Sequence, residues 1–561
     1  MSKTTATAHV TLGIALAAGV AATIALPRTA HATGPITLGY AMALPSSDGG
    51  SEPRATVTPD GKHYAISNIG GTATVYESDD GLANWHATNA GGIAGQSIPT
   101  IDVDLVSMPA ASAHPGRLIA TELDTAGLNF RTSWSDDGGA NWTTSTLAGA
   151  PNTDGSQYAD QDRPWLATGP HDRVYMLMHN LASGTANHNM YVATSTDAGA
   201  SFGPFIPLTT PGEQANTDLQ CADSGGPSNL FVDQNNGQLY AVWGSRSSIV
   251  AGGCGASVTG SFEINVVAAT RVWIATAPES GTALPAGAPG GWTQSLAVDD
   301  NAAAKIVGMQ LAPGAIDSAG NVYILYPESP QSYPDYDGGA IKYVHATESD
   351  IIANPYGITG PSKQIWSSPV TVAPGGGAGN LLPHIVAGGP GQIDMAYFAG
   401  VEENAPATTA DWYLTAAQTT DALDTSPAIA YAQITDATSS PAYSGWSASE
   451  MMGACNQPPQ SAINGFACNR STDVWGIALD NQGQLLVTWP KASHHNFGCS
   501  NGDATCHTYV TRQTDGPTIG PASVSANTPE TPWTPLLVAG GLFVAGLALE
   551  VRHKRFRKTT I

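Results

Sequence analysis

Positively charged residues are scarce in this sequence. It has 21 Lys and Arg against 45 Asp and Glu. Residues 33–530 hold 14 of those cations and 44 of the acids, a net charge of about −30 (14 minus 44). Nucleic acid is a poor partner for such a surface, because binding it depends on neutralising phosphates with basic side chains. We therefore expect no nucleic-acid partner.

Long helical periodicity and the common cofactor signatures are also absent. The chain contains no nucleophile elbow, phosphate-binding loop or dinucleotide fingerprint. We therefore expect no cofactor. The sequence is rich instead in turn residues, with 63 Gly and 39 Pro, and in short β-rich runs between them. This pattern predicts an all-β protein.

The start of the chain has the order of a secretory signal peptide. Lys3 precedes an apolar run over residues 11–26, and Ala30-His31-Ala32 follows. A charged start, a short apolar core and an A-x-A site are typical of such a signal. Residues 1–32 are therefore predicted to be a signal peptide, and the fold is sought in residues 33–525.

The end of the chain predicts a membrane anchor. Residues 533–551 are almost wholly apolar, and a run of about 20 such residues spans a bilayer. Residues 552–561 are basic, which places them on the cytoplasmic side. A short linker, 526–532, precedes the predicted helix, for which a buried core helix is the alternative. The body is thus expected to be exported, tethered to the membrane, and monomeric.

Only six cysteines are present, and no C-x-x-C pattern occurs. An even number in an exported protein favours disulfides, and we expect no metal site. The simplest scheme pairs near neighbours, although the sequence leaves the connectivity open. It joins Cys455 to Cys468, Cys499 to Cys506, and Cys221 to Cys254.

One phrase recurs through the body: a turn, then a short apolar strand with aromatic residues. Each copy follows another short apolar run, so each pair predicts a β-hairpin with a Gly-type turn. The copies lie at residues 58–67, 113–122, 169–178, 233–242, 317–326, 388–397 and 480–489. Repetition on this scale indicates an array of similar modules, and a four-stranded module of this length is a propeller blade. We expect a β-propeller of seven blades, with six as the alternative, whose last blade is completed by residues 34–43.

A second motif, S-x-D-x-G-x-x-W, recurs after the third strand of early repeats. Its residues are Ser78, Asp80 and Trp85, then Ser135, Asp137, Gly139 and Trp142, then Ser195, Asp197, Gly199 and Phe202. Leu82 stands where the first copy should have Gly. This motif resembles the Asp box, or BNR repeat, of the sialidase superfamily, whose members are β-propellers.

The chemistry of the motif predicts a structural role. Asp and Ser side chains bond nearby backbone N–H groups in turns, Gly accepts a positive φ, and the aromatic residue buries apolar surface. The resemblance implies that these boxes lie on the outer turn between the third and fourth strands, away from the ligand site. Their carboxylates are therefore not expected to be catalytic.

Arginines precede the first strand of three hairpins: Arg54, Arg163 and Arg470. The resemblance implies an arginine triad that binds the carboxylate of a sugar, for which a planar guanidinium is well suited. The alternative is that Arg54 and Arg163 form strand-end salt bridges with their neighbours Glu52 and Asp162.

The resemblance also implies a Tyr nucleophile activated by a Glu, with an Asp as acid and base. Tyr336, Glu328 and Asp162 are the predicted catalytic residues, and ordinary surface solvation is the alternative for each. The chain departs from the family in lacking an R-I-P triplet, with the order Pro53-Arg54-Ala55 instead, and in its seven hairpins.

These patterns predict a cell-surface protein with a glycan or glycoprotein ligand. The first hypothesis is a sialidase-like propeller that recognises sialic acid or a related glycan, with exo-α-sialidase activity. The second is a non-catalytic binding or adhesion propeller. The arginines favour the enzyme, and the missing R-I-P triplet favours the binding protein.

Overall fold

All seven predicted hairpins form antiparallel strand pairs. In the computed structural model each pair is the inner half of a sheet of four or five strands, and seven such sheets are present among the described residues. The prediction of a seven-bladed β-propeller is therefore confirmed, and the six-bladed alternative is wrong.

The described residues form most of the body. They are residues 34–69, 72–88, 93, 100–124, 130–147, 161–180, 190–210, 212–219, 227–245, 268–279, 292–303, 305–309, 311–330, 338–357, 360–361, 364–402, 410–436, 439–446, 448–451, 475–492 and 506–520.

The strands of each blade follow one another in the chain. Blade one contains β3 (Gly50–Val57), β4 (His63–Ile69), β5 (Thr72–Ser78) and β6 (His86–Ala87). Blade two contains β7 (Thr100–Ser107), β8 (Leu118–Asp124), β9 (Phe130–Ser135) and β10 (Thr143–Thr144). Blade three contains β12 (Gln161–Thr168), β13 (Val174–Asn180), β14 (Met190–Ser195) and β16 (Ile206–Pro207). Blade four contains β17 (Pro227–Val232), β18 (Leu239–Ser245), β20 (Arg271–Ala277) and β21 (Thr293–Asp299).

The later blades have the same order. Blade five contains β23 (Gly314–Ile316), β24 (Asn321–Glu328), β25 (Ala340–Thr347) and β28 (Val370–Ala373). Blade six contains β29 (Asn380–Ala387), β30 (Ile393–Glu402), β31 (Ala410–Thr419), β32 (Ala430–Ile434) and β33 (Tyr443–Trp446). Blade seven contains β34 (Gly476–Leu479), β35 (Leu485–Ala492), β36 (Cys506–Asp515), β1 (Thr37–Leu38) and β2 (Met42–Ala43).

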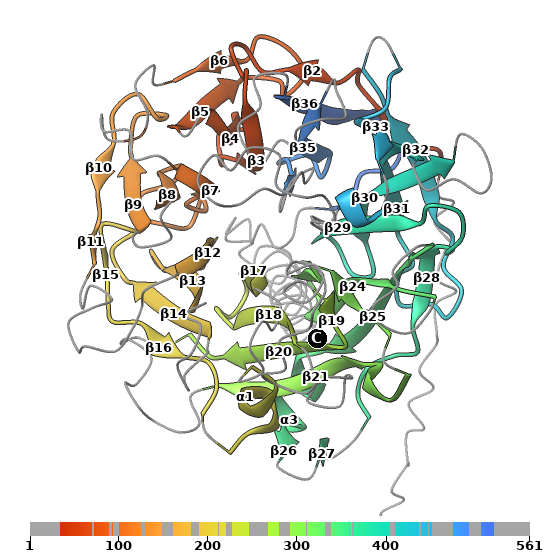
Figure 1. Ribbon diagram of the computed structural model, residues 1–561. Coiled ribbons are helices and arrows are strands. Elements are labelled where there is room, and N and C mark those ends of the chain that lie inside the picture. The colour runs from red at the N-terminus through yellow and green to blue at the C-terminus, as the bar shows by residue number, and fades with distance from the viewer. Residues whose placement is uncertain are drawn as a thin grey trace, which may run out of the picture. The chain divides into compact units, whose positions relative to one another are not determined.

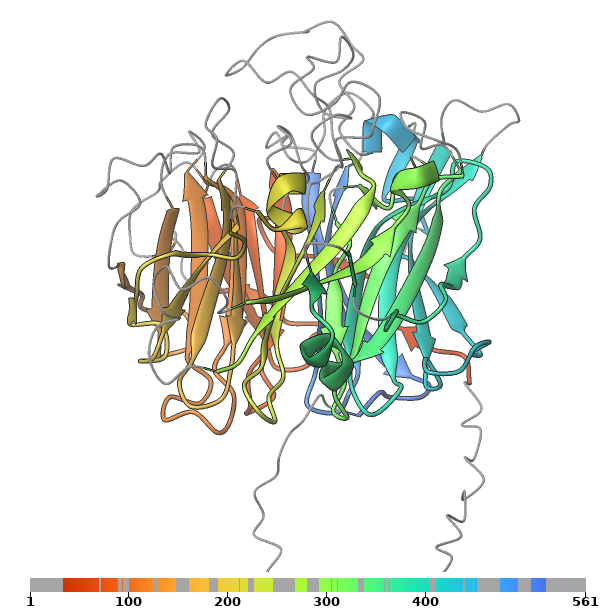
Figure 2. The same cartoon turned by 90° about the horizontal axis from the view of Figure 1, so that it is seen from below.

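Short elements decorate the blades. Three two-residue pairs join β11 (Thr146–Leu147) to β15 (Ser201–Phe202), β19 (Ala268–Ala269) to β22 (Gly308–Met309), and β26 (Tyr356–Gly357) to β27 (Gly360–Pro361). The helices are α1 (Gln214–Leu219), the 3-10 turn η2 (Asn301–Ala303), α3 (Glu348–Ala353) and α4 (Ala448–Met451). Figure 2 shows α1 (yellow) and α4 (cyan) at one end of the strands and α3 (green) at the other.

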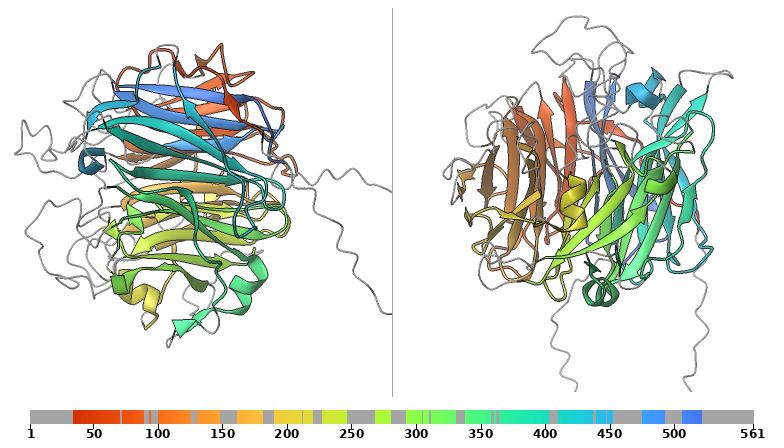
Figure 3. Two further views of the ribbon diagram at one scale, coloured as in Figure 1. Left: turned by 90° about the vertical axis from the view of Figure 1, so that its right-hand side faces the viewer. Right: turned by 60° about the horizontal axis from the view of Figure 1, so that its bottom comes forward.

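The innermost strands close into a ring around one axis. Each of β3, β7, β12, β17, β23, β29 and β34 contacts the next, and β34 contacts β3 (Figure 1). Blade seven therefore lies beside blade one, as Figure 3 also shows in blue and red. The innermost strands all begin at the same end of the ring, which we call the strand-start end.

Blade seven is completed by the beginning of the described chain. β1 pairs with β36 at Leu38 and Gln513, and β2 pairs with it at Met42 and Val510. The prediction that residues 34–43 complete the last blade is confirmed. This pairing covers β36, so the ring presents no free outer edge there.

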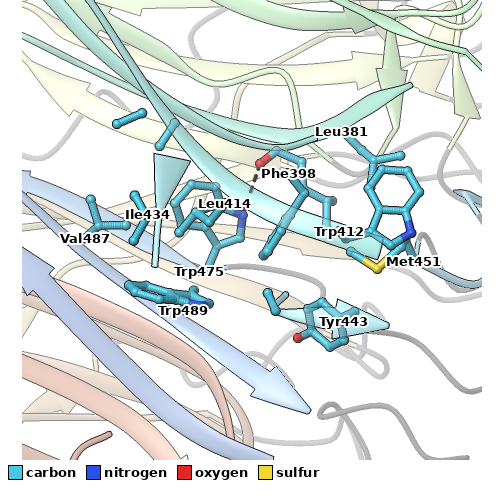
Figure 4. Packing of buried hydrophobic residues seen from close by; sticks show 14 of the residues in the cluster. Leu381, Phe398, Trp412, Leu414, Ile434, Tyr443, Met451, Trp475, Val487 and Trp489 are labelled. Atoms are coloured by element: carbon cyan, nitrogen blue, oxygen red, sulfur yellow. Dashed lines mark hydrogen bonds between the residues drawn. The ribbon is translucent and has the colours of Figure 1, made fainter. Parts of the chain in front are cut away.

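Apolar side chains fill the seams between neighbouring blades. The buried residues fall into seven clusters, one at each seam. The largest lies between blades six and seven, where the Phe398 ring contacts those of Trp475 and Tyr443 (Figure 4). Each blade packs against a neighbour on both faces. Successive side chains of its strands, which point to opposite faces, are therefore both mostly apolar.

The three Asp boxes lie between the third and fourth strands of blades one to three. In the second box the Ser135 hydroxyl donates to Asp137 at 2.8 Å and accepts from Gly139 N at 2.9 Å. Asp137 also accepts from Asn141 N at 2.9 Å. Ser195, Asp197 and Gly199 repeat the first two bonds in the third box.

The first box closes one residue earlier. Gly81, with φ of 67°, donates its N–H to the Ser78 hydroxyl at 3.1 Å, and Asp80 accepts from Leu82 N and Ala83 N. Gly81 thus takes the place that the pattern gave to residue 82. Because the third strand of a blade ends opposite the strand-start end, all three boxes lie at the other end of the ring.

The aromatic residue of the motif is not equally buried in the three copies. Trp85 and Phe202 are 6% and 2% exposed, whereas Trp142 is only half-buried. Trp142 instead donates its indole N–H to Gly139 O at 2.8 Å, within its own turn. The expectation that the aromatic residue buries apolar surface where strands meet therefore holds only in part for Trp142, whose ring packs against the cluster between blades one and two but stays half-exposed.

Several predicted features lie outside the described residues. These are the signal peptide, the linker, the predicted helix at 533–551, the basic tail, and five cysteines. Cys506 is buried and disulfide-bonded, but its partner is not described. Within the described ranges no helix is long and apolar enough to cross a membrane. The anchor and the disulfide scheme stay predictions.

We predict that Phe202→Ala destabilises the fold by about 3–5 kcal/mol, because a fully buried aromatic ring leaves a cavity. Trp142→Ala should cost less, since its ring is half-buried and the seam stays filled. Chemical denaturation of the two variants measures both losses. An equal or larger loss for Trp142→Ala would show that this turn, rather than the seam, carries the stability of the motif.

Candidate functional site

Three innermost strands begin with the same strained backbone. Glu52, Arg163 and Leu382 have positive φ angles of 50°, 54° and 50°. Each precedes a proline, and each lies where the register of its hairpin shifts. A residue other than Gly in this region, held there before a proline, costs about 1–3 kcal/mol. Strain of this kind clusters at functional sites, so the strand-start end is the candidate site.

Polar residues form one layer of the ring just below this strain. Each inner strand pairs with its neighbour down to a last residue, which is Val57, Ser107, Thr168 or Ala387 in blades one, two, three and six. The residue three positions before that one is, in the same order, Arg54, Asp104, Trp165 and His384. These four residues therefore have the same height on blades one, two, three and six. We call this set the axial layer.

Arg54 joins four blades. Its Nη1 donates to the carbonyl of Trp475, which precedes β34 in blade seven. Its Nε lies 3.6 Å from Asp104 Oδ1 in blade two. Its guanidinium stacks 4.2 Å from the ring centroid of Trp165 in blade three. Arg54 is therefore an internal tie between blades.

The partners of Arg54 extend these contacts around the ring. Asp104 accepts the N–H of Leu166 at 2.7 Å, and Trp165 Nε1 donates to Pro227 O of blade four at 2.8 Å. On the other side, Trp475 Nε1 donates to the carbonyl of Leu382 in blade six at 3.0 Å, the bond drawn in Figure 4. The axial layer thus links blades six, seven, one, two, three and four.

Charged side chains lie above the axial layer. Glu52, Asp102 and Arg163 are 3%, 4% and 5% exposed. The backbone N–H of Arg163 donates to Asp102 Oδ2 at 3.2 Å. Arg163 is also close enough to Arg54 for its charge to lower the pKa of that guanidinium. Two arginines and three carboxylates, counting Asp104, therefore share this end of the axis.

The burial of these groups shifts their ionisation. Burial lowers the pKa of Arg54, while Asp104, Glu52 and Asp102 act in the opposite direction. Burial raises the pKa of Asp104. Burial, aided by the Arg54 charge, lowers the pKa of His384 well below 6.5. His384 is thus a neutral imidazole whose Nε2 has no hydrogen bond, and its ring packs 4.3 Å from that of Trp475.

The arginine-triad prediction needs correction in its geometry. Arg54 and Arg163 come together at the axis, but they lie within β3 and β12 rather than before them. They are also not equivalent, since Arg163 precedes the proline of its strand and Arg54 follows it. Arg54 forms its ion pair with Asp104 of blade two, and its neighbour Glu52 adds a weaker electrostatic attraction. Arg470 lies outside the described residues.

The predicted catalytic residues are not brought together by the described contacts. Glu328 ends β24 and accepts from Lys342 Nζ at 2.6 Å and Lys305 Nζ at 3.3 Å. Although burial alone would raise its pKa, Lys342 and Lys305 hold the pKa of Glu328 below its ordinary value. Asp162 lies in β12 opposite His179, but its side chain is not described. Tyr336 lies outside the described residues.

Sequence reasoning missed Asp104 and His384, which have as large a place in the axial layer as Arg54. The sequence does contain a signal for His384. A proline precedes the axial residue at matching positions of three hairpins, in Pro53-Arg54, Pro164-Trp165 and Pro383-His384. In the part of the chain that the structure describes, no group of three or more His, Cys, Asp or Glu side chains could hold a metal ion.

We predict that Arg54→Met destabilises the fold by about 3–5 kcal/mol, because it leaves the Asp104 carboxylate buried without its cation. Lys62→Met is the matched control, since Lys62 pairs with Glu77 at 2.5 Å but is 41% exposed. An exposed pair contributes at most about 1 kcal/mol. Denaturant unfolding compares the two. Equal losses would mean that Arg54 does not tie the blades together.

Comparisons with known proteins give no family for this chain. No family model matches it, and no curated protein does. The solved structures that it resembles include the α-L-arabinofuranosidase of Fusarium graminearum bound to arabinobiose, with 10% identity and a TM-score of 0.39 over 85% of this chain and 97% of that one.

Two further structures are a polysaccharide lyase and a protein of unknown function. The ulvan lyase bound to a GlcA-Rha3S unit has 9% identity and a TM-score of 0.45, over 87% of this chain and 95% of that one. The Dyadobacter fermentans protein has 11% identity and a TM-score of 0.36, over 66% and 96%. At these values no residue role is carried over from those proteins.

Proposed function

We propose that this chain is an exported, glycan-directed β-propeller whose ligand binds at the strand-start end. The observation that carries the proposal is the strained backbone of Glu52 and Arg163, which holds charged side chains at that end of the axis. Each strained residue costs about 1–3 kcal/mol. Contacts between neighbouring inner strands at this end can form without such strain. Asn229 of blade four exchanges two hydrogen bonds with the backbone of Gly314 in blade five, and Asn229 has no positive φ.

The class of ligand comes from the motif resemblance. The Asp boxes on three consecutive blades resemble those of sialidases, which suggests a sialic acid or a related glycan. An exo-α-sialidase is the first candidate activity. In that case Arg163 contacts the carboxylate of the sugar, and Arg54 positions it from the axial layer.

A non-catalytic binding propeller is the second candidate, and two observations favour it. Arg54 is already engaged by Asp104, Trp165 and the Trp475 carbonyl. Glu328 is neutralised by two lysines, so it is a weak proton acceptor for a tyrosine. The described carboxylates near the axis also outnumber the arginines, which weakens the attraction for an anionic sugar.

Release of 4-methylumbelliferone from its α-sialoside by the purified protein distinguishes the two candidates. Turnover above a buffer blank across several pH values supports the sialidase. Absence of turnover, together with binding to immobilised glycans, supports the binding propeller. A protein that shows no turnover and binds no glycan would contradict the proposal.

We predict that Arg163→Asn weakens glycan binding by about tenfold or more, because a charge-assisted hydrogen bond contributes about 1.5–3 kcal/mol. Asn tolerates a positive φ, so the backbone of β12 should be kept. Loss of a buried cation among carboxylates should lower the melting temperature, so binding is measured well below it. Arg173→Asn is the control, since Arg173 pairs with Glu279 at 3.3 Å at the opposite end of the ring. Equal losses of binding in the two variants would place the ligand elsewhere.

We also propose that residues 533–551 anchor the protein in the membrane with the propeller outside. Truncation after Pro529 should then release the protein into the medium. Fractionation of cells that express the two forms tests this. A truncated form that remains with the membrane would contradict the anchor.

A further inference from the structure

A buried carboxyl lies far from the proposed ligand site. Asp394 is the second residue of β30, which begins at the end of the ring opposite the strand-start end. It faces the seam between blades six and seven, because Ala396 and Phe398, on the same face of β30, belong to the cluster that fills it. Asp394 is fully buried.

Asp394 faces an amide rather than a cation. Gln418 of β31 lies directly opposite it in the sheet and is also fully buried. Gln418 is the side-chain hydrogen-bond partner of the Asp394 carboxyl, but no bond of ordinary geometry satisfies either oxygen of Asp394 or the Oε1 and Nε2 of Gln418. Buried polar atoms without partners are costly, so four of them side by side require an explanation.

No described charge compensates Asp394. The titratable groups of this seam are His384, Tyr443, Lys491, Asp436 and Tyr509, and all five lie towards the strand-start end, whereas Asp394 lies at the opposite end. Lys491 is paired with Asp436 at 2.5 Å. Burial, moderated only by Gln418, raises the pKa of Asp394 to about 7.

A protonated carboxyl satisfies all four atoms. Its O–H donates to Gln418 Oε1, while Gln418 Nε2 donates to the other oxygen of Asp394. An ionised carboxylate cannot do so, because one of its oxygens then meets the amide oxygen and two acceptors face each other. The pairing of these two side chains therefore selects the neutral acid.

We propose that Asp394 is a neutral carboxylic acid paired with Gln418, and that its ionisation weakens the seam between blades six and seven. This makes the seam a pH-sensitive element of the propeller. The inference is independent of the ligand and of the proposed function, since it concerns the opposite end of the ring.

The direction of the pH effect follows from the two states. The pKa of Asp394 is about 7 in the folded protein against 3.8 as its ordinary value. Between these values the folded state binds one more proton than the unfolded state. The unfolding equilibrium constant should therefore rise up to about tenfold per pH unit from pH 4 towards 7. Above pH 7 both states are ionised at this group, so Asp394 should no longer add to the slope.

Denaturant unfolding from pH 4.5 to 8.5 tests the proposal in the full chain and in Asp394→Asn. Asn and Gln form the same two-bond pair without a titrating proton. The variant should lose about one unit of slope in log K against pH below 7, and it should unfold less readily than the wild type at pH 8. An unchanged slope would overturn the proposal.

Glu122→Gln is the matched control. Burial raises the pKa of Glu122 to about 7 as well, but Glu122 accepts from Arg131 at 2.5 Å in the seam between blades one and two. Removing its charge leaves Arg131 without a carboxylate, so this variant should be less stable at every pH. Asp394→Asn should be more stable at pH 8, and a loss there like that of Glu122→Gln would show that the ionised carboxylate is compensated in the seam, which would overturn the proposal.

A direct measurement keeps the proposal testable if Asp394→Asn fails to fold. Infrared difference spectra of the wild type between pH 5 and 9 should contain the carbonyl band of a protonated carboxyl that disappears near pH 7. Labelling with ¹³C-aspartate should shift that band, which separates Asp394 from Glu122. A spectrum with no aspartic acid band titrating in this range would overturn the proposal.

Discussion

Every blade of a closed ring must pack against two neighbours, and the seam that closes the ring must hold as well as the others. In this protein the seam between blades seven and one has the least apolar material. Its cluster has six buried residues, against 22 between blades six and seven. Directional polar contacts supplement it. Arg54 reaches the Trp475 carbonyl, Asp480 pairs with Arg512 at 2.9 Å and lies 3.7 Å from His63, and Asn481 donates to Thr58 O.

This arrangement explains how an acidic protein uses its few cations. Six arginines of the described body form ion pairs with carboxylates, and most of these partners are deeply buried. The pairs are Arg54–Asp104, Arg117–Asp136, Arg131–Glu122, Arg173–Glu279, Arg271–Asp218 and Arg512–Asp480. A buried carboxylate needs a cation, hydrogen-bond donors or a proton. Asp104, Glu122, Asp218 and Asp480 have an arginine, and Asp317 accepts from Asn321, Tyr323 and the Gly391 N–H, whereas for Asp394 we propose the proton of its own carboxyl.

The sequence was sufficient to predict the ring of blades but not the contacts between side chains inside it. Hairpins, Asp boxes and the closing segment 34–43 depend on local turn chemistry and short apolar runs, which can be read along the chain. The role of Arg54 depends on Asp104 and Trp165, which follow it by 50 and 111 residues (104 minus 54, 165 minus 54). Such contacts have no local signature.

The same limit explains Asp394 and Trp142. Alternation places polar residues outward only when one face of a sheet meets water, and both faces of a blade are buried. A lone Asp in the run IDMAY therefore carries no indication of its surroundings. For Trp142 the motif fixes the turn but not the side on which the ring packs, so its neighbours decide its burial.

The pairing of β1 with β36 sets an order on the folding of the chain. Leu38 and its partner Gln513 are separated by 475 positions along the sequence (513 minus 38). Blades one to six can form from contiguous segments as these become available, because their strands are neighbours in the chain. Blade seven cannot, and contacts of such high sequence separation form slowly. A chain made from its N-terminus therefore remains an open arc, with residues 37–43 unpaired, until nearly the whole body has been synthesised.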